Sequence, residues 1–275
     1  MQGDQNIILD VKDILIKSYG NLRDNLKSYL IICYVMMFPM SLWQLISPLT
    51  IDMETTQAID LLPRLLCTLV FLLFFSIFLY RLFLLGKDRQ YKVTPSKLLD
   101  IFTKTFLYTL ALGAVMVLAL LSVVLLFGLV IVVINSMAGE NAMENSSVST
   151  IILFFISILL MLIIFRTLPT FISIAIGEAT IPMKSAYYYT RENGKQLILI
   201  GLGCYIPVSI LSGLLIIAIA QLGITGNTFG AVLSFILSPL SIAPFALQTS
   251  AGAEIFKTLV PGAKEHLETI TDHAE

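Results

Sequence analysis

Long apolar runs constrain the fold of this chain more than any other feature of its sequence. Each run has roughly twenty residues or more, which lets an α-helix cross about 30 Å of hydrocarbon. Six runs are present, at 28–47, 62–85, 105–134, 150–176, 197–222 and 229–256. Only 13% of the 275 residues are charged, about half the fraction found in soluble domains. We therefore predict an all-α integral membrane protein with six transmembrane helices.

The charges between the runs predict the orientation of the helices. Lys and Arg near the ends of a span stay on the cytoplasmic side, whereas Asp and Glu have little influence. Three segments carry basic residues and are placed inside: Lys12, Lys17, Arg23 and Lys27; Lys87, Arg89, Lys92, Lys97 and Lys104; Lys184, Arg191 and Lys195. The opposite connections, 48–61, 135–149 and 223–228, contain neither Lys nor Arg. We expect both termini on the cytoplasmic side.

An amphipathic segment precedes the predicted membrane domain of residues 28–258, and a short tail follows it. Residues 1–27 mix apolar and charged side chains near helical spacing, which predicts a cytoplasmic helix at the membrane surface. The pattern fits equally well the cytoplasmic start of the first span, broken near Gly20 and Asn21. Residues 259–275 are polar and form a predicted cytoplasmic tail.

Two basic segments resemble each other and indicate an internal repeat. Pro95-Ser96-Lys97 and the following Ile101-Phe102-Thr103-Lys104 match Pro182-Met183-Lys184 and Tyr188-Tyr189-Thr190-Arg191 in order and spacing. We predict a short interfacial helix at each, because Pro suits the first turn of a helix. The preceding runs carry Tyr80-Arg81 and Phe165-Arg166. The two units would be parallel repeats about an axis normal to the membrane, and a threefold repeat is the alternative.

Charged side chains within the runs are the candidates for a lipid-binding or polar site. A charge at the middle of a bilayer costs about 2.5–3.5 kcal/mol on insertion scales. Arg81 lies near Gly86, so its guanidinium is expected to snorkel to lipid phosphates. For Arg166 we expect a carboxylate, backbone carbonyls or a lipid phosphate as partner, with Glu178 and Glu254 as candidate carboxylates. The two arginines are predicted at similar depths, around a common site at headgroup level.

The last run is the most polar and irregular, and it is the helix that we expect to face any cavity. Its polar and kinking residues are Ser234, Ser238, Pro239, Ser241, Pro244, Gln248, Thr249 and Ser250. Prolines interrupt helices that line cavities in transporters, but ordinary structural kinks are the favoured interpretation. In the fifth run Gly201 and Gly203 predict close packing within the bundle rather than a dimer seam.

The chain lacks the residue clusters that catalysis or metal binding require. His266 and His273 are confined to the tail, and no His, Asp or Glu occupies the middle of a run. Cys33, Cys67 and Cys204 lie within apolar runs without metal-ligand spacing. A net charge of −1 and the absence of a long basic run argue against nucleic acid. We expect a protein that is not an enzyme and has no cofactor or metal.

Several ordered features lie around 86–110 and 165–215. They are the basic segment from Gly86 to Leu99, Gly177-Glu178-Ala179 before Lys184-Ser185-Ala186, and Arg191-Glu192-Asn193-Gly194-Lys195 opening the next run. In these features the chain resembles the YciC-like proteins, uncharacterised bacterial inner-membrane proteins, and the membrane domain of some glycerophosphodiester phosphodiesterases. The resemblance implies the fold and a bacterial inner-membrane location but no activity. The Val-Pro-Gly turn often found in the family's central hairpin is replaced here by residues 135–149.

These patterns predict a non-catalytic multi-pass membrane protein that binds lipid or another membrane protein and supports envelope organisation. A second copy of the chain is a further candidate partner. The alternative is a transporter or channel for a small or lipid-like substrate. A polar, water-accessible path near the midplane would favour a transporter, whereas a dry core with a broad binding face would favour a scaffold.

Overall fold

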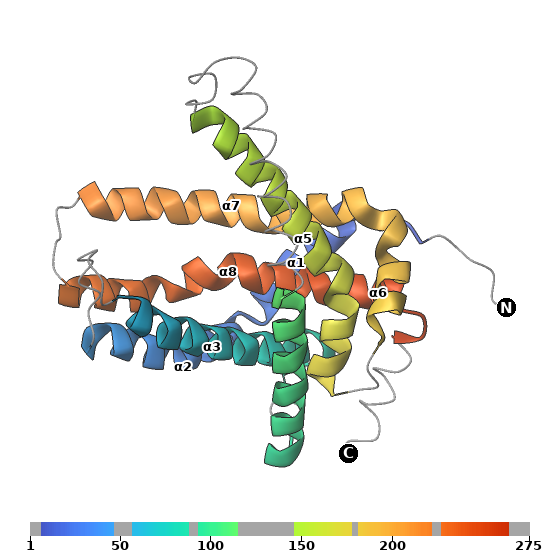
Figure 1. Ribbon diagram of the computed structural model, residues 1–275, viewed down its shortest axis with the longest axis horizontal. Coiled ribbons are helices and arrows are strands. Elements are labelled where there is room, and N and C mark those ends of the chain that lie inside the picture. The colour runs from blue at the N-terminus through green and yellow to red at the C-terminus, as the bar shows by residue number, and fades with distance from the viewer. Residues whose placement is uncertain are drawn as a thin grey trace.

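In the computed structural model, every regular element of the described residues is a helix (Figure 1). The described residues are 7–46, 57–87, 93–114, 146–177, 181–221 and 227–263. The helices are α1 (Val11–Asp24), α2 (Leu26–Ile46), α3 (Gln57–Leu85), a helix at 95–114, α5 (Ser146–Ile176), α6 (Met183–Thr190), the 3-10 turn η1 (Arg191–Asn193), α7 (Gly194–Gln221) and α8 (Asn227–Leu259). Because these ranges contain no strand, the all-α prediction is confirmed for them.

Five of the six apolar runs coincide with α2, α3, α5, α7 and α8. The third run begins within the helix at 95–114, and its remainder lies outside the described residues. Two described stretches are long and apolar enough to cross a membrane, Cys67–Leu85 and Met183–Leu215. Leu26–Pro39 and Met161–Ile176 are shorter apolar helices. The structure therefore confirms an all-helical chain with apolar helices, and the count of six spans stays a prediction.

Helix α8 lies among the other long helices and packs against α7, α2, α1, α3 and α5 (Figure 1). Small side chains make this close packing feasible, and Ala246 and Ala251 are fully buried. At Gly252 a Cβ atom would lie 2.5 Å from Cδ2 of Leu168 in α5 and 3.1 Å from the Tyr80 hydroxyl in α3. Gly252 therefore marks the point where α3, α5 and α8 converge.

The amphipathic N-terminal segment forms α1, which packs into the bundle against α8 and α7. The Asp10 side chain begins the helix by accepting a hydrogen bond from the Asp13 amide. Ser18 is buried, and its carbonyl accepts a hydrogen bond from the Ser250 hydroxyl of α8 at 3.3 Å. The helix ends at Asn25, not near Gly20 as one of the two predictions had it. The N-terminal helix is thus an integral part of the core.

A buried asparagine joins the segment before α1 to the start of α7. Asn193 is only 1% exposed. Its side-chain oxygen accepts a hydrogen bond from the Leu9 amide at 2.8 Å, and its side-chain nitrogen donates to the Ile7 carbonyl at 2.9 Å. One side chain therefore satisfies two backbone groups that precede α1 and have no helical partner.

The segment of α7 around Pro207 is also bonded to α1. Pro207 lacks the N–H that would bond to the Gly203 carbonyl, and this carbonyl accepts a hydrogen bond from the Tyr19 hydroxyl at 3.0 Å. A Cβ atom at Gly203 would lie 2.7 Å from Cδ1 of Leu15, and one at Gly201 would lie 2.6 Å from a sulfur of α5. The prediction that these two glycines pack inside the bundle is confirmed. Burial raises the pKa of Tyr19, which keeps its hydroxyl protonated as a donor.

The two segments of the predicted repeat differ in structure. Both preceding helices end at a glycine in the left-handed region, Gly86 with φ 84° and Gly177 with φ 79°. The second segment breaks into α6 and η1 before α7, as the prediction of a short helix requires. The first segment continues without a break from Pro95 through residue 114 and lies across the direction of α3 (Figure 1). The prediction of a separate short helix at Pro95 is therefore wrong.

Candidate functional site

The sequence-predicted residue Arg81 caps a neighbouring helix instead of reaching lipid. Its side chain is buried, with 5% of the residue exposed, and Nη1 donates to the Ile176 carbonyl at 3.1 Å. Ile176 is the last residue of α5, where helical carbonyls have no N–H partner within the helix. The prediction that Arg81 snorkels toward phosphate is wrong, because the end of α5 offers the guanidinium an acceptor inside the bundle.

Arg166 meets an aromatic ring, a kind of partner that the sequence did not predict. Its Cζ lies 4.6 Å from the centre of the Tyr187 ring of α6, within the range of a cation–π contact. A Cβ atom at Gly194 would lie 3.4 Å from its Nη2, so the guanidinium also lies close to the start of α7. Its Nε is buried and has no hydrogen-bond partner in the described part of the chain. One donor of the guanidinium is therefore left without an acceptor in the described part of the chain.

The carboxylates expected as partners of Arg166 do not reach it in any described contact. Glu178 lies outside the described residues. The Glu254 carboxylate accepts hydrogen bonds from Nδ2 of Asn21 and Nζ of Lys257, both at 3.0 Å. Glu254 therefore links α8 to α1, and its assignment to Arg166 is wrong.

Arg81 and Arg166 lie at different distances from the end of α5. Arg81 lies four residues before the end of α3 and contacts the last residue of α5. Arg166 lies ten residues before that same end of α5, which corresponds to about 15 Å along the helix. Because α5 is inclined to the other long helices (Figure 1), this distance is not a difference in depth, and the similar depths of the two arginines stay a prediction.

A cavity lies between α3, the helix at 95–114, α5, α7 and α8. Its volume is about 720 Å³, within the usual range for small-molecule sites. Apolar side chains form most of the wall and include Leu69, Leu72, Leu73, Met161, Phe165, Leu168, Phe171, Leu202 and Phe245. None of the described residues that line it is charged.

Hydroxyl groups and one amide interrupt this apolar wall. The Ser76 hydroxyl donates to the Leu72 carbonyl at 2.6 Å, and the Tyr108 hydroxyl donates to the Thr167 carbonyl at 3.1 Å. The Thr249 hydroxyl likewise donates to a carbonyl of its own helix at 2.8 Å. The half-buried Gln248 differs, because its amide has no hydrogen-bond partner among the described residues. Gln248 is thus a polar group of this wall with free hydrogen-bonding capacity, as is Tyr205 of α7, whose hydroxyl has no hydrogen bond to a described residue.

The prediction that the last helix faces a cavity is confirmed, although the wall was not predicted. From α8 the residues Phe245, Gln248 and Thr249 line the cavity and follow Pro244 closely. Most of the wall comes from α3 and α5, whose leucines and phenylalanines have the same character as side chains that face lipid. Apolar composition therefore gave no signal for this part of the site.

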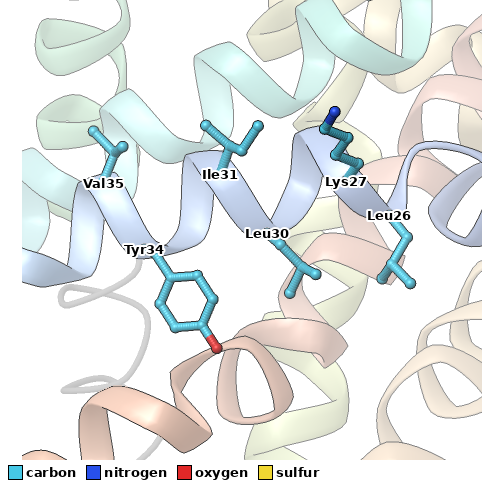
Figure 2. A pocket seen from close by; sticks show the side chains of 6 residues that line it. All are labelled: Leu26, Lys27, Leu30, Ile31, Tyr34 and Val35. Atoms are coloured by element: carbon cyan, nitrogen blue, oxygen red, sulfur yellow. The ribbon is translucent and has the colours of Figure 1, made fainter.

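A second hollow is shallow and follows one helix (Figure 2). Its volume is about 530 Å³, and all its described lining residues belong to α2: Leu26, Lys27, Leu30, Ile31, Tyr34 and Val35. Figure 2 shows Tyr34 and Leu30 on one side of the helix and Ile31 and Val35 on the other. The Tyr34 hydroxyl donates to the Ile236 carbonyl of α8 at 3.3 Å. This hollow is a feature of the surface rather than an enclosed site.

Comparison with known proteins adds no functional assignment. Among the described residues no group of three or more His, Cys, Asp and Glu side chains could hold a metal ion. No protein-family model, no curated protein and no solved structure matches the chain. These comparisons neither support nor contradict the resemblance to the YciC-like proteins.

Proposed function

We propose that the chain is a six-span protein of a bacterial inner membrane, with both termini in the cytoplasm and a YciC-like fold. Helix α7 supports this proposal. Only 22% of the apolar stretch around Met183–Leu215 is buried, and its exposed side chains include Leu199, Ile206, Ile210, Leu211 and Leu214. Water solvates such an extended apolar face poorly, whereas hydrocarbon solvates it well. The alternation of basic connections supports the orientation.

Cysteine labelling tests this topology. In a background with the three native cysteines replaced by serine, Asn141→Cys is expected to react with an impermeant maleimide added to spheroplasts. Ile270→Cys is expected to react only after the membrane is permeabilised, because the tail would face the cytoplasm. Labelling of position 270 in intact spheroplasts with protection of position 141 would contradict the topology.

We further propose that the protein binds lipid without changing it chemically and thereby supports envelope organisation. The cavity of about 720 Å³ carries this proposal, because its apolar wall and few polar groups match the character of lipid and other small-molecule sites. Its described lining contains no His, Asp, Glu, Lys, Arg or Cys side chain. A membrane-protein partner or a second copy of the chain would bind to the exposed faces.

Filling the cavity tests the binding function. Gly113 lines the cavity, and a Cβ atom there would meet nothing within 4 Å, so Gly113→Phe is expected to occupy the cavity without a backbone clash. Native mass spectrometry of wild-type protein released from its membranes is expected to show a lipid-sized adduct that Gly113→Phe lacks. Gly213→Phe is the matched control, since its Cβ also meets nothing within 4 Å but lies outside the cavity lining. An adduct of equal abundance in both variants would contradict binding in this cavity.

Arg166 is proposed as a contact for lipid phosphate, because its side chain is half-buried and no carboxylate forms an ion pair with it among the described residues. Arg166→Leu is expected to reduce both folded yield and co-purified anionic lipid, since leucine loses the charge and the contact with Tyr187. Arg166→Lys keeps the charge and is expected to retain part of the bound lipid. Phospholipid quantification of the purified variants measures the amount of co-purified anionic lipid. Unchanged yield and lipid content in Arg166→Leu would show that the residue is merely tolerated.

A transporter of a small or lipid-like substrate is the second candidate. The position of Gln248 and Thr249 one turn after Pro244 favours it, because kinked helices with polar residues line substrate sites in transporters. Uptake of a cavity-binding lipid into proteoliposomes, abolished by Gly113→Phe, would favour transport over static binding.

A further inference from the structure

We propose that the cavity selects an uncharged amphiphile, a molecule with one hydrocarbon chain that ends in a hydroxyl, ester or amide group bound by Gln248. This inference rests on the proposed lipid-binding function and specifies the chemical class of its ligand. It places the polar group of the ligand against α8 and the hydrocarbon chain between α3 and α5.

The described lining offers no charged side chain that could pair with an ionised headgroup. The described residues of the wall are apolar or neutral, and Arg81 and Arg166 are not among them. A phosphate or carboxylate enclosed here would lose its water without gaining a counter-charge, which is strongly unfavourable. A hydroxyl or carbonyl group loses less on leaving water, and a single amide can replace its hydrogen bonds. The wall therefore favours a neutral ligand over an anionic lipid of the same chain length.

On α3 and α5 the polar groups of the wall lie toward one end of the cavity. Along α3 the lining passes from Leu69 and Leu72 to Ser76 and Tyr80, and these limits span about 16 Å of helix. The Tyr80 hydroxyl lies 3.1 Å from the place of a Cβ atom at Gly252, one turn after Gln248 on α8, so this polar end adjoins α8.

The lining residues of α5 also change from apolar to polar along the helix, beside those of α3. Its lining begins with Met161 and Ile164 and reaches Thr167 and Phe171. The Tyr80 ring of α3 lies 5.7 Å from the Phe171 ring, so the two polar ends coincide. A ligand with one polar end and one apolar tail matches this gradient.

Gln248 supplies the free polar group at that end. The hydroxyls of Ser76, Tyr108 and Thr249 already donate to backbone carbonyls. The Gln248 amide offers two donors and an acceptor and has no partner in the structure described. Because the half-buried Gln248 amide lines the cavity, it can form a hydrogen bond with a ligand oxygen at this position and stabilise it.

Two photoreactive probes with the same alkyl chain test the inference on the full chain in nanodiscs. One is an alkylglycerol ether, which is uncharged, and the other is an alkyl phosphate. We expect the ether to cross-link to peptides containing residues 69–80 and 161–171 at least roughly tenfold more than the phosphate. Gln248→Leu is expected to reduce cross-linking of the ether by roughly five- to tenfold, the effect of one lost hydrogen bond. Gln196→Leu is the matched control, because Gln196 lies on α7 and does not line the cavity.

The outcomes separate this inference from the function on which it rests. Equal cross-linking of the phosphate to the same peptides would overturn the selection of uncharged ligands but leave lipid binding in place. A Gln248→Leu variant that cross-links like Gln196→Leu would overturn the role of Gln248. If neither probe cross-links to these peptides in folded protein, and wild type carries no lipid adduct, the proposed function itself is wrong.

Discussion

Replacing Asn193 with alanine is expected to lower the free energy of unfolding by about 1–3 kcal/mol. The Leu9 amide and the Ile7 carbonyl both lose their hydrogen-bond partner, and Leu9 is itself buried. An alanine at this position offers neither a donor nor an acceptor, and the segment before α1 is too tightly enclosed at Leu9 for water to replace it fully. Equilibrium unfolding in mixed detergent micelles measures the loss, and hydrogen exchange of the Leu9 amide locates it.

Asn25→Ala provides the control for Asn193→Ala. Asn25 also donates through its side chain, but to the Asn21 carbonyl at the end of its own helix, at 2.8 Å. The Asn21 carbonyl keeps the hydrogen bond from the backbone amide of residue 25, at 3.1 Å, so the expected cost is below about 1 kcal/mol. Equal destabilisation by the two variants, with the Leu9 amide still protected in Asn193→Ala, would contradict the role assigned to Asn193.

Gly203→Ala is expected to destabilise the protein by about 1–3 kcal/mol through overpacking. The added methyl group would lie 2.7 and 3.0 Å from the two δ-carbons of Leu15 and 3.4 Å from its Cγ, so the whole side chain would have to move. Because Tyr19 lies one turn further along α1 and bonds to the Gly203 carbonyl, separation of α1 from α7 would also weaken that bond. Thermal and detergent unfolding measure the effect.

A second variant makes the steric origin of this effect testable. Leu15→Ala removes the atoms that meet the new methyl group, so the double variant is expected to be more stable than the sum of the single effects predicts, by about 1 kcal/mol or more. Gly213→Ala meets nothing within 4 Å and is expected to stabilise the helix by about 0.5–1 kcal/mol. Additive effects of Gly203→Ala and Leu15→Ala would show that the two residues do not compete for space.

The sequence predicts the helices well and their neighbours poorly. The runs that end at residues 85 and 176 coincide with the ends of α3 and α5, because an apolar stretch of this length forms a helix and a following glycine ends it. Partners are harder to predict, since a leucine that faces lipid and one that faces a neighbouring helix have the same hydropathy. Contacts such as Gly252 with Leu168 therefore emerge only from the structure.

The candidate site illustrates the same limit. Charge identifies Arg81 and Arg166 in the sequence, but their partners, the Ile176 carbonyl and the Tyr187 ring, depend on where other helices end. The polarity of the last run indicates a cavity beside Gln248. The opposing wall consists of ordinary apolar residues, and no local pattern distinguishes a cavity wall from a packed core.

The hydrogen bond between the Leu9 amide and the Asn193 side chain also constrains the order in which parts of the chain reach their final positions during synthesis. The two residues are 184 positions apart, as are Tyr19 and Gly203. At typical translation rates the ribosome needs about 10–40 s to make that length of chain. Helix α1 is made first, yet its hydrogen-bond partners on η1 and α7 do not exist until most of the protein has been translated. The N-terminus of the chain is therefore among the last parts to reach its final position.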